Sequence, residues 1–313
     1  MAKICIVLAT YNGEKYLPEM LNSLIYQERA ANVIIAVDDG STDSTLSILE
    51  KYKDKLPLQI FASKENHGHR AAFSKGLELA KEQLLSDDLI ALADQDDIWL
   101  PEKIKILEKE IGKNALVFGD AEIINGYGFT TAPSWRAYSS IDTKCSMKQQ
   151  IAGINNVTGC LCLFKVSLLD KILPIPENVT VHDRWLAMFA MRNGGIKAIP
   201  QIVVKYRIHG GNAVGGAKQA SMSKTLETQE KWVEEILRHA ENLNLTPDEI
   251  LFAQKLKKAS KLRQTKWFIP SLLPFAFKNR KNLFLKANFI VTLKRIAFTT
   301  VGLPLAKKLF RKD

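Results

Sequence analysis

Residues 89–101 are Leu89-Ile90-Ala91-Leu92-Ala93-Asp94-Gln95-Asp96-Asp97-Ile98-Trp99-Leu100-Pro101, an apolar run of strand length that ends in three carboxylates within four residues. Proline cannot continue a strand, so the run stops here. Oxygen ligands from aspartate suit Mg²⁺ or Mn²⁺, which complete their coordination with water and substrate phosphates. Asp94 and Asp96 can turn toward one ion from a strand end. We predict a divalent metal site here; the alternative is a solvated acidic turn.

Three earlier apolar runs are each followed by a polar cluster, and segments with helical periodicity separate them. The runs are 4–9, 32–37 and 58–61, and the polar clusters that follow are 10–13, 38–43 and 66–70. Strands that alternate with helices predict a parallel α/β sheet, in which ligands gather at the carboxyl ends of the strands. Four polar clusters in order are a stronger indication of a binding site than any single one.

The composition is that of a soluble globular protein. The chain has 313 residues, of which 46% are hydrophobic and 25% are charged, enough for one large domain or two. Its four cysteines have no metal-finger spacing, and we interpret them as reduced core residues of a cytoplasmic protein. The chain goes from Met1-Ala2-Lys3 directly into a strand, without room for a signal peptide, and no apolar stretch approaches the ~20 residues that span a bilayer.

The net charge of +11 is concentrated near the C-terminus. Residues 254–313 contain sixteen Lys and Arg but one acid, which leaves 28 bases and 32 acids in the first 253 residues. Bases alternate there with large hydrophobic residues, a pattern that suits attachment to an anionic cytoplasmic membrane surface. The alternative is a helical bundle with a solvated basic face. Nucleic acid is a poor partner for the net acidic remainder.

Three segments together resemble the nucleotide-binding half of inverting family 2 glycosyltransferases with the GT-A fold: 7–12, 37–43 and 93–99. The Asp-Gln-Asp-Asp-Ile-Trp sequence, with 182–185 and 206–212 downstream, is similar to the rhamnosyltransferase-like members. The resemblance covers roughly residues 3–215. It implies a Rossmann-like, mostly parallel sheet in a catalytic domain, residues 1–218, with a nucleotide-sugar half (1–120) and an acceptor half (121–218). A helical extension, residues 219–313, would follow.

The resemblance implies a donor site at the first strand ends. Thr10 and Tyr11 would hold the base, and Asp39, alone or with Asp38, would accept the imide N–H of uracil or thymine. Arg70 would approach the diphosphate. The implied donor-binding residues are Ala9, Thr10, Tyr11, Asn12, Glu14, Asp38, Asp39, Arg70, Asp94, Gln95 and Asp96.

For the metal, Mg²⁺ or Mn²⁺, the resemblance favours Asp96 as the direct ligand, together with Asp94. His209 is a third ligand, a phosphate contact or a structural residue, and the sequence leaves these open. Asp97 contacts the metal or caps the helix that starts near Pro101.

On the acceptor side, Asp183 matches the position of the family's catalytic aspartate, the base for the attacking hydroxyl. The family often has Glu-Asp where this chain has His-Asp, and the alternative role for Asp183 is a helix N-cap. The other acceptor-side residues implied are Asn156, Thr158, Gly159, His182 and Trp185. The long polar region 125–143 is an acceptor-side loop or a surface excursion.

The resulting hypothesis is an inverting, metal-dependent glycosyltransferase that acts on a hydroxyl of a surface polysaccharide or lipid-linked glycan. L-Rhamnose from dTDP-rhamnose is the first choice of donor, and a UDP-hexose is the alternative. The expected location is the cytoplasm, peripheral at the inner face of the cell membrane. A nucleotidyltransferase is less favoured because no glycine- and lysine-rich phosphate loop follows the first strand. The oligomeric state, homo-oligomers included, stays open.

Overall fold

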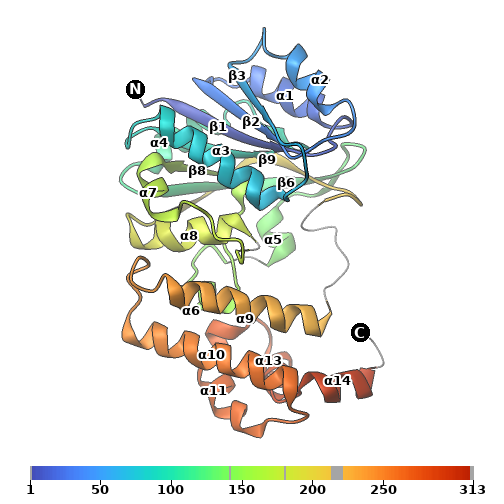
Figure 1. Ribbon diagram of the computed structural model, residues 1–313, viewed down its shortest axis with the longest axis vertical. Coiled ribbons are helices and arrows are strands. Elements are labelled where there is room, and N and C mark those ends of the chain that lie inside the picture. The colour runs from blue at the N-terminus through green and yellow to red at the C-terminus, as the bar shows by residue number, and fades with distance from the viewer. Residues whose placement is uncertain (1, 141, 180, 213–220, 311–313) are drawn as a thin grey trace. The chain divides into compact units, whose positions relative to one another are not determined.

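The computed structural model describes residues 2–140, 142–179, 181–212 and 221–310, which form two compact units (Figure 1). The first unit comprises residues 1–143, 157–177 and 181–217, and the second comprises 144–156, 178–180 and 218–313. Residues 144–156, which we placed in the catalytic domain, thus group with the C-terminal helices.

The first unit is built on one mixed sheet with the strand order β3-β2-β1-β4-β8-β6-β9-β5, and β7 pairs with β6. The strands are β1 (Ile4–Thr10), β2 (Val33–Asp38), β3 (Leu58–Ala62), β4 (Leu89–Asp94), β5 (Ile98–Trp99), β6 (Leu116–Asn125), β7 (Thr130–Ala132), β8 (Cys162–Lys165) and β9 (Ile196–Ile208). The pairs β3/β2, β2/β1, β1/β4 and β6/β9 are parallel, whereas β8 is antiparallel to both β4 and β6. The predicted α/β class is therefore confirmed.

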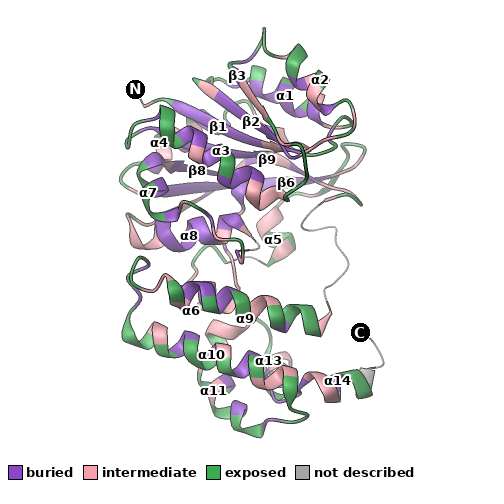
Figure 2. Ribbon diagram, viewed as in Figure 1, coloured by how far each residue is buried: buried purple, intermediate pink, exposed green. Residues whose placement is uncertain are grey.

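The central strands of the sheet are buried (Figure 2), and because their side chains are apolar on both faces, helices cover the sheet. The helices of this unit are α1 (Leu17–Ile25), α2 (Thr45–Lys51), α3 (His69–Gln83), α4 (Lys103–Ile111), α5 (Trp135–Ser139), α7 (Leu169–Ile172) and α8 (His182–Arg192), with 3-10 turns η1 (Gly159–Leu161) and η2 (Val166–Leu168). Ile6 and Leu8 of β1 belong to the same buried cluster as Leu17 of α1. On the other face, a Cβ at Gly76 of α3 would lie 2.4 Å from Val7 Cγ1, so α3 packs closely on β1.

The polar region that follows β6 is more regular than we expected. It contains β7 and α5, and Asp120 of β6 holds α5 in place. The Asp120 carboxylate accepts hydrogen bonds from Ser134 Oγ (2.6 Å) and from the backbone N–H of Arg136 (3.1 Å). Farther along the chain, residues 159–161 form the turn η1, and β8 begins directly after it at Cys162.

The second unit is helical, as predicted for the C-terminal region. Its helices are α6 (Met147–Ala152), α9 (Met222–Arg238), α10 (Pro247–Thr265), α11 (Leu273–Lys278), α12 (Arg280–Leu283), α13 (Phe289–Phe298) and α14 (Leu303–Phe310), with the 3-10 turn η3 (Pro270–Leu272). Thr246 and Glu249 form a capping box at the start of α10. Trp232 of α9 is buried and donates its indole N–H to the carbonyl of Gln150 at 3.2 Å. None of the helices in the described ranges is both long and apolar enough to cross a bilayer.

His182, the first residue of α8, is a buried histidine in the first unit. Its ring stacks on Phe73 of α3 with centroids 4.1 Å apart, and within the described chain neither ring nitrogen has a hydrogen-bond partner. Burial, reinforced by the nearby His69, lowers the pKa of His182 to about 3. The imidazole is therefore neutral at physiological pH.

This buried histidine should make the fold sensitive to acid. Between about pH 6.5 and pH 3 the unfolded chain binds a proton that native His182 does not bind, so the free energy of unfolding falls as the pH is lowered. We expect His182→Phe to remove about 2 kcal/mol of the stability loss between pH 7 and pH 5, measured by urea unfolding. Unfolding at pH 8 gives the baseline for the packing change itself. Wild-type and variant curves that fall in parallel below pH 7 would contradict this assignment.

Candidate functional site

The polar clusters meet at one edge of the sheet because β1, β2 and β4 are parallel neighbours. Thr10, the last residue of β1, is in register with Asp38, the last residue of β2. On the other side of β1, Ala9 is in register with Asp94, the last residue of β4. The structure therefore brings together the donor-side residues that the sequence predicted at three separate strand ends.

Asp38 and Asp39 have different environments. Asp38 is fully buried and accepts hydrogen bonds from Thr10 Oγ1 (2.9 Å) and from the backbone N–H of Ser41 (2.9 Å), so it shapes the junction of β1 and β2. Asp39 accepts the backbone N–H groups of His67 (2.9 Å) and Gly68 (2.7 Å) and fixes the loop before α3. Each oxygen of Asp39 keeps a second lone pair that could accept a ligand donor.

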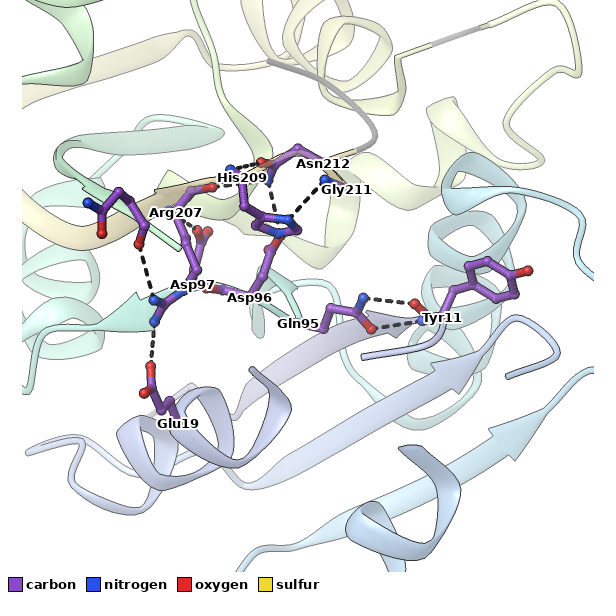
Figure 3. A network of polar contacts seen from close by, with 10 residues as sticks. Tyr11, Glu19, Gln95, Asp96, Asp97, Arg207, His209, Gly211 and Asn212 are labelled. Atoms are coloured by element: carbon purple, nitrogen blue, oxygen red, sulfur yellow. Dashed lines mark hydrogen bonds and ion pairs between the residues drawn. The ribbon is translucent and has the colours of Figure 1, made fainter. Parts of the chain in front are cut away.

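Gln95 ties the loop after β1 to the acidic segment. Its side-chain amide accepts from the backbone N–H of Tyr11 (2.8 Å) and donates to the Tyr11 carbonyl (2.9 Å), as Figure 3 shows. Tyr11 is 45% exposed, so part of this residue is accessible to a ligand. In the same loop, Asn12 Oδ1 accepts from the Thr42 backbone (2.9 Å) and Glu14 Oε2 from the Ser44 backbone (3.1 Å). Asn12 and Glu14, both predicted to bind the sugar-nucleotide donor, thus stabilise this loop as hydrogen-bond acceptors.

Asp96 faces a histidine and an asparagine that follow β9 (Figure 3). His209 Nε2 lies 2.9 Å and Asn212 Nδ2 3.1 Å from Asp96 Oδ2. His209 Nδ1 accepts from the backbone N–H of Gly211 at 3.1 Å, and this bond leaves Nε2 as the nitrogen that faces Asp96. With Nδ1 as the acceptor, Nε2 carries the proton of the neutral ring and donates it to Asp96 Oδ2, so Nε2 would have to lose this proton before it could bind a cation beside Asp96.

Arg207 organises this part of the site, although the sequence analysis did not single it out. Its side chain is 1% exposed, pairs with Glu19 of α1, and donates from Nε to the Asp96 carbonyl at 2.8 Å. Its backbone N–H donates to Asp97 Oδ1 at 3.1 Å. The only sequence signal was its place two residues before His209 in the 206–212 motif, because a single arginine in a strand usually faces solvent.

Asp97 does not cap a helix, so that alternative is wrong. The N-cap of α4 is Glu102, and Asp97 accepts from Arg207 instead. Asp97 is fully buried, and its Oδ2 has no hydrogen-bond partner within the described residues.

Two of the carboxylates at this edge of the sheet, Asp94 and Asp97, have raised pKa values because they are buried close to other negative charges. Burial, followed by the charges of Asp96 and Asp183, raises the pKa of Asp94 to about 7. Burial, followed by Asp96 and Asp94, raises the pKa of Asp97 well above its usual range. Carboxylates with raised pKa values are stabilised by a bound cation or by protons, and such perturbed groups are typical of functional sites.

A second group of potential ligands lies deeper. One ligand atom each from Asp94, Asp97 and Cys160 lies within 4.8 Å of the others. Burial raises the pKa of the Cys160 thiol well above its usual value, so the sulfur keeps its proton at neutral pH. Mg²⁺ and Mn²⁺ prefer oxygen ligands, so a protonated thiol suits them poorly. Of the three predicted metal residues, Asp94 belongs to this deeper group, whereas Asp96 and His209 contact each other at 2.9 Å outside it.

Asp183 lies in the first turn of α8, where the N-cap is Val181, so the N-cap alternative for Asp183 is also wrong. Asp183 is 9% exposed, and its Oδ2 accepts the backbone N–H of Gly159 at 3.1 Å. Thr158 Oγ1, next to Gly159, accepts from the indole N–H of Trp135 in α5 at 3.0 Å. On the predicted acceptor side, the turn at Thr158 and Gly159 therefore contacts both the Asp183 carboxylate and the indole of Trp135.

Four other predicted residues have structural contacts. Trp185 is 1% exposed and donates its indole N–H to the carbonyl of Ile172. Asn156 belongs to the second unit, where its Oδ1 accepts from Gln150 at 2.8 Å. Arg70 Nη1 donates to the Ile175 carbonyl at 3.1 Å. His182 packs on Phe73, as described above.

Sequence comparison relates the chain to known glycosyltransferases. The family model described as glycosyl transferase family 2 matches residues 5–173. The dTDP-rhamnosyl transferase RfbG of Shigella flexneri is 31% identical over 224 residues, which cover 66% of this chain and 73% of RfbG. An uncharacterized glycosyltransferase of Nostoc sp. is 27% identical over 241 residues, 72% of this chain and 71% of the relative.

Structural comparison agrees. Residues 1–349 of Staphylococcus aureus TarS, solved in complex with UDP-GlcNAc, align with a TM-score of 0.59 and 20% identity over 95% of this chain and 81% of that chain. The mannosyltransferase PcManGT of Pyrobaculum calidifontis, solved with GDP-Man and Mn²⁺, aligns with a TM-score of 0.52 and 16% identity over 99% and 88%. These likenesses confirm the predicted GT-A fold. Because the family model also matches more than half of its residues, the chain belongs to glycosyl transferase family 2.

Proposed function

We propose that this protein transfers a sugar from a nucleoside diphosphate to a hydroxyl group of a glycan, with inversion at the anomeric carbon. The observation that carries the proposal is the gathering of acidic side chains at one sheet edge, where Asp96 faces His209 at 2.9 Å and where the negative charge of Asp183 helps to raise the pKa of Asp94. Such an arrangement provides both a place for a charged diphosphate with its cation and a base for a hydroxyl.

The donor is a dTDP- or UDP-sugar. Asp39 accepts the imide N–H that thymine and uracil share, and the exposed ring of Tyr11 stacks on the base. Arg70 reaches the diphosphate by leaving its contact with Ile175. L-Rhamnose on dTDP is the first choice, supported by the 31% identity to RfbG, and a UDP-hexose is the alternative, supported by the UDP-GlcNAc complex of TarS.

The chemistry is a single displacement. Asp183, oriented by the Gly159 N–H, takes the proton from the attacking acceptor hydroxyl. Asp96, together with Asp94 and His209, would hold Mg²⁺ or Mn²⁺, which when bound would supply positive charge to the diphosphate leaving group. The PcManGT complex, which contains Mn²⁺, supports a metal in this fold.

Two variants separate binding from chemistry. In a thermal-shift experiment we expect dTDP or UDP with Mn²⁺ to raise the melting temperature of the wild-type protein, because a ligand that binds only the native state stabilises it. Asp96→Ala should lose the metal-dependent part of the shift. Asp183→Asn should keep the shift but release nucleoside diphosphate from the sugar nucleotide about 100-fold more slowly or worse.

Asp87→Ala, at an exposed acid just before β4, is the matched control and should behave as wild type. The donor-site assignment is wrong if no nucleotide raises the melting temperature with any metal. Wild-type turnover by Asp183→Asn would remove that residue from the role of base.

We further propose that the C-terminal part of the second unit attaches the protein to the inner face of the cell membrane, where a lipid-linked glycan acceptor lies. Of the eighteen large apolar side chains that are exposed among the described residues, ten lie within 267–309. The same segment contains eight Lys and Arg and no acid. An apolar groove of about 540 Å³ lies between α11 and α13, lined by Leu273, Pro274, Phe277, Leu293, Ile296 and Ala297. Apolar side chains flanked by bases complement an anionic bilayer surface.

Vesicle sedimentation tests this attachment. We expect the protein to bind vesicles that contain phosphatidylglycerol, less strongly in high salt, and to bind pure phosphatidylcholine weakly. Replacing both Phe289 and Ile290 by Ser, at side chains 74% and 65% exposed, should weaken binding about 10-fold or more without loss of core packing. Leu85→Ser, 74% exposed in the first unit, is the control. Equal binding by all three proteins would exclude this surface as the attachment site.

A further inference from the structure

Lys103 is a fully buried lysine at the start of α4, directly behind the acidic segment. Its Nζ donates to the carbonyl of Cys160 at 2.5 Å and lies 3.1 Å from the ring centroid of Trp99. Lysine is rarely buried completely unless a partner compensates it. Its carbonyl and aromatic partners, together with the acids nearby, provide that compensation.

The charged and titratable groups that act on Lys103 come from both sides of the site. Burial lowers the pKa of Lys103 to about 7, whereas Cys160, Cys162, Asp97 and Asp94 act in the opposite direction. Lys103 in turn lowers the raised pKa of Asp94. The amine therefore lies between the carboxylates of the donor side and the turn of the acceptor side.

The Lys103 partner belongs to the turn that contacts the proposed base. Cys160 is the central residue of η1, and the first residue of that turn, Gly159, donates its N–H to Asp183 Oδ2 at 3.1 Å. The Gly159 carbonyl accepts from the Cys162 thiol at 3.0 Å. The turn η1 therefore accepts a hydrogen bond from Lys103 at Cys160 and donates one to Asp183 from Gly159.

We propose that Lys103 is a positioning residue that fixes η1 through the Cys160 carbonyl and thereby orients the Asp183 carboxylate through the Gly159 N–H. This inference rests on the proposed role of Asp183 as the base. A backbone N–H that donates to a carboxylate both orients it and favours its ionised form. If the turn shifts, Asp183 loses both effects, while the nucleotide contacts on β1 and β2 stay in place.

The test compares Lys103→Met with Lys105→Met, the same substitution at an exposed position of the same helix, where the lysine pairs with Glu28 at the surface. For Lys103→Met we expect kcat to fall about 10- to 100-fold with unchanged affinity for UDP and Mn²⁺ measured by calorimetry. The acid limb of the kcat profile should move to higher pH, because Asp183 would lose its N–H donor. Asp94 and Cys162 are the titratable groups coupled to Asp183, and Lys103→Met also removes a charge that lowers the pKa of Asp94. A shift of the acid limb therefore supports the proposal only together with a change in the hydrogen exchange of the turn.

Amide hydrogen exchange of peptides that cover residues 157–163, measured without ligand, gives a readout that does not depend on the reaction. This exchange should be faster in Lys103→Met than in wild type or Lys105→Met.

If wild type turns over no sugar nucleotide, the proposed function fails and this exchange alone decides the role of Lys103. Unchanged exchange, or an unchanged acid limb in an active enzyme, would overturn the proposal. Should Lys103→Met not fold, Lys103→Gln, whose neutral side chain is one bond shorter and should weaken the contact with the Cys160 carbonyl, is tested by the same criteria.

Discussion

Repulsion between carboxylates at the end of β4 is the constraint on which the site depends. Asp94, Asp96, Asp97 and Asp183 act on one another in surroundings that exclude much of the solvent, and burial is the largest cause of the raised pKa values of Asp94 and Asp97. An acidic cluster of this kind is stable only if donors and cations surround it. The contacts of the first unit follow from that need: Asp96 accepts from Asn212, Asp97 from the backbone N–H of Arg207, and Asp183 from the backbone N–H of Gly159.

Arg207 shows how the fold meets this need. Its guanidinium joins Glu19 of α1 to the backbone at Asp96, and its own N–H reaches Asp97, so one side chain connects β9, α1 and the acidic segment. An arginine that is 1% exposed is costly to bury, and its pairing with Glu19 together with two backbone carbonyls compensates the cost. We infer that α1 and β9 hold the segment in the conformation in which Asp96 meets His209.

The sequence predicted the elements that depend on local patterns. Apolar runs that end in polar clusters identified β1, β2, β3 and β4, and the parallel arrangement then placed Asp38 and Asp94 on either side of β1. The sequence did not predict the environments of side chains that depend on packing between distant segments of the chain. Trp185 and His182 lie in a conspicuous motif but pack inside the core. Lys103 resembled any lysine near a helix start, because nothing in its neighbours indicates that β8 and its preceding turn cover it.

The position of β8 explains why donor and acceptor features lie so close together. A strand antiparallel to β4 begins where β4 ends, and Ala91 is indeed paired with Leu163, near the first residue of β8. The turn that precedes β8 therefore lies beside the acidic end of β4 rather than at the opposite edge of the sheet. This single reversal of direction lets Lys103 reach the Cys160 carbonyl from the donor side, and it lets Gly159 of the same turn donate to Asp183. In an all-parallel sheet the loop before the neighbouring strand would lie at the far edge, and the base would need another support.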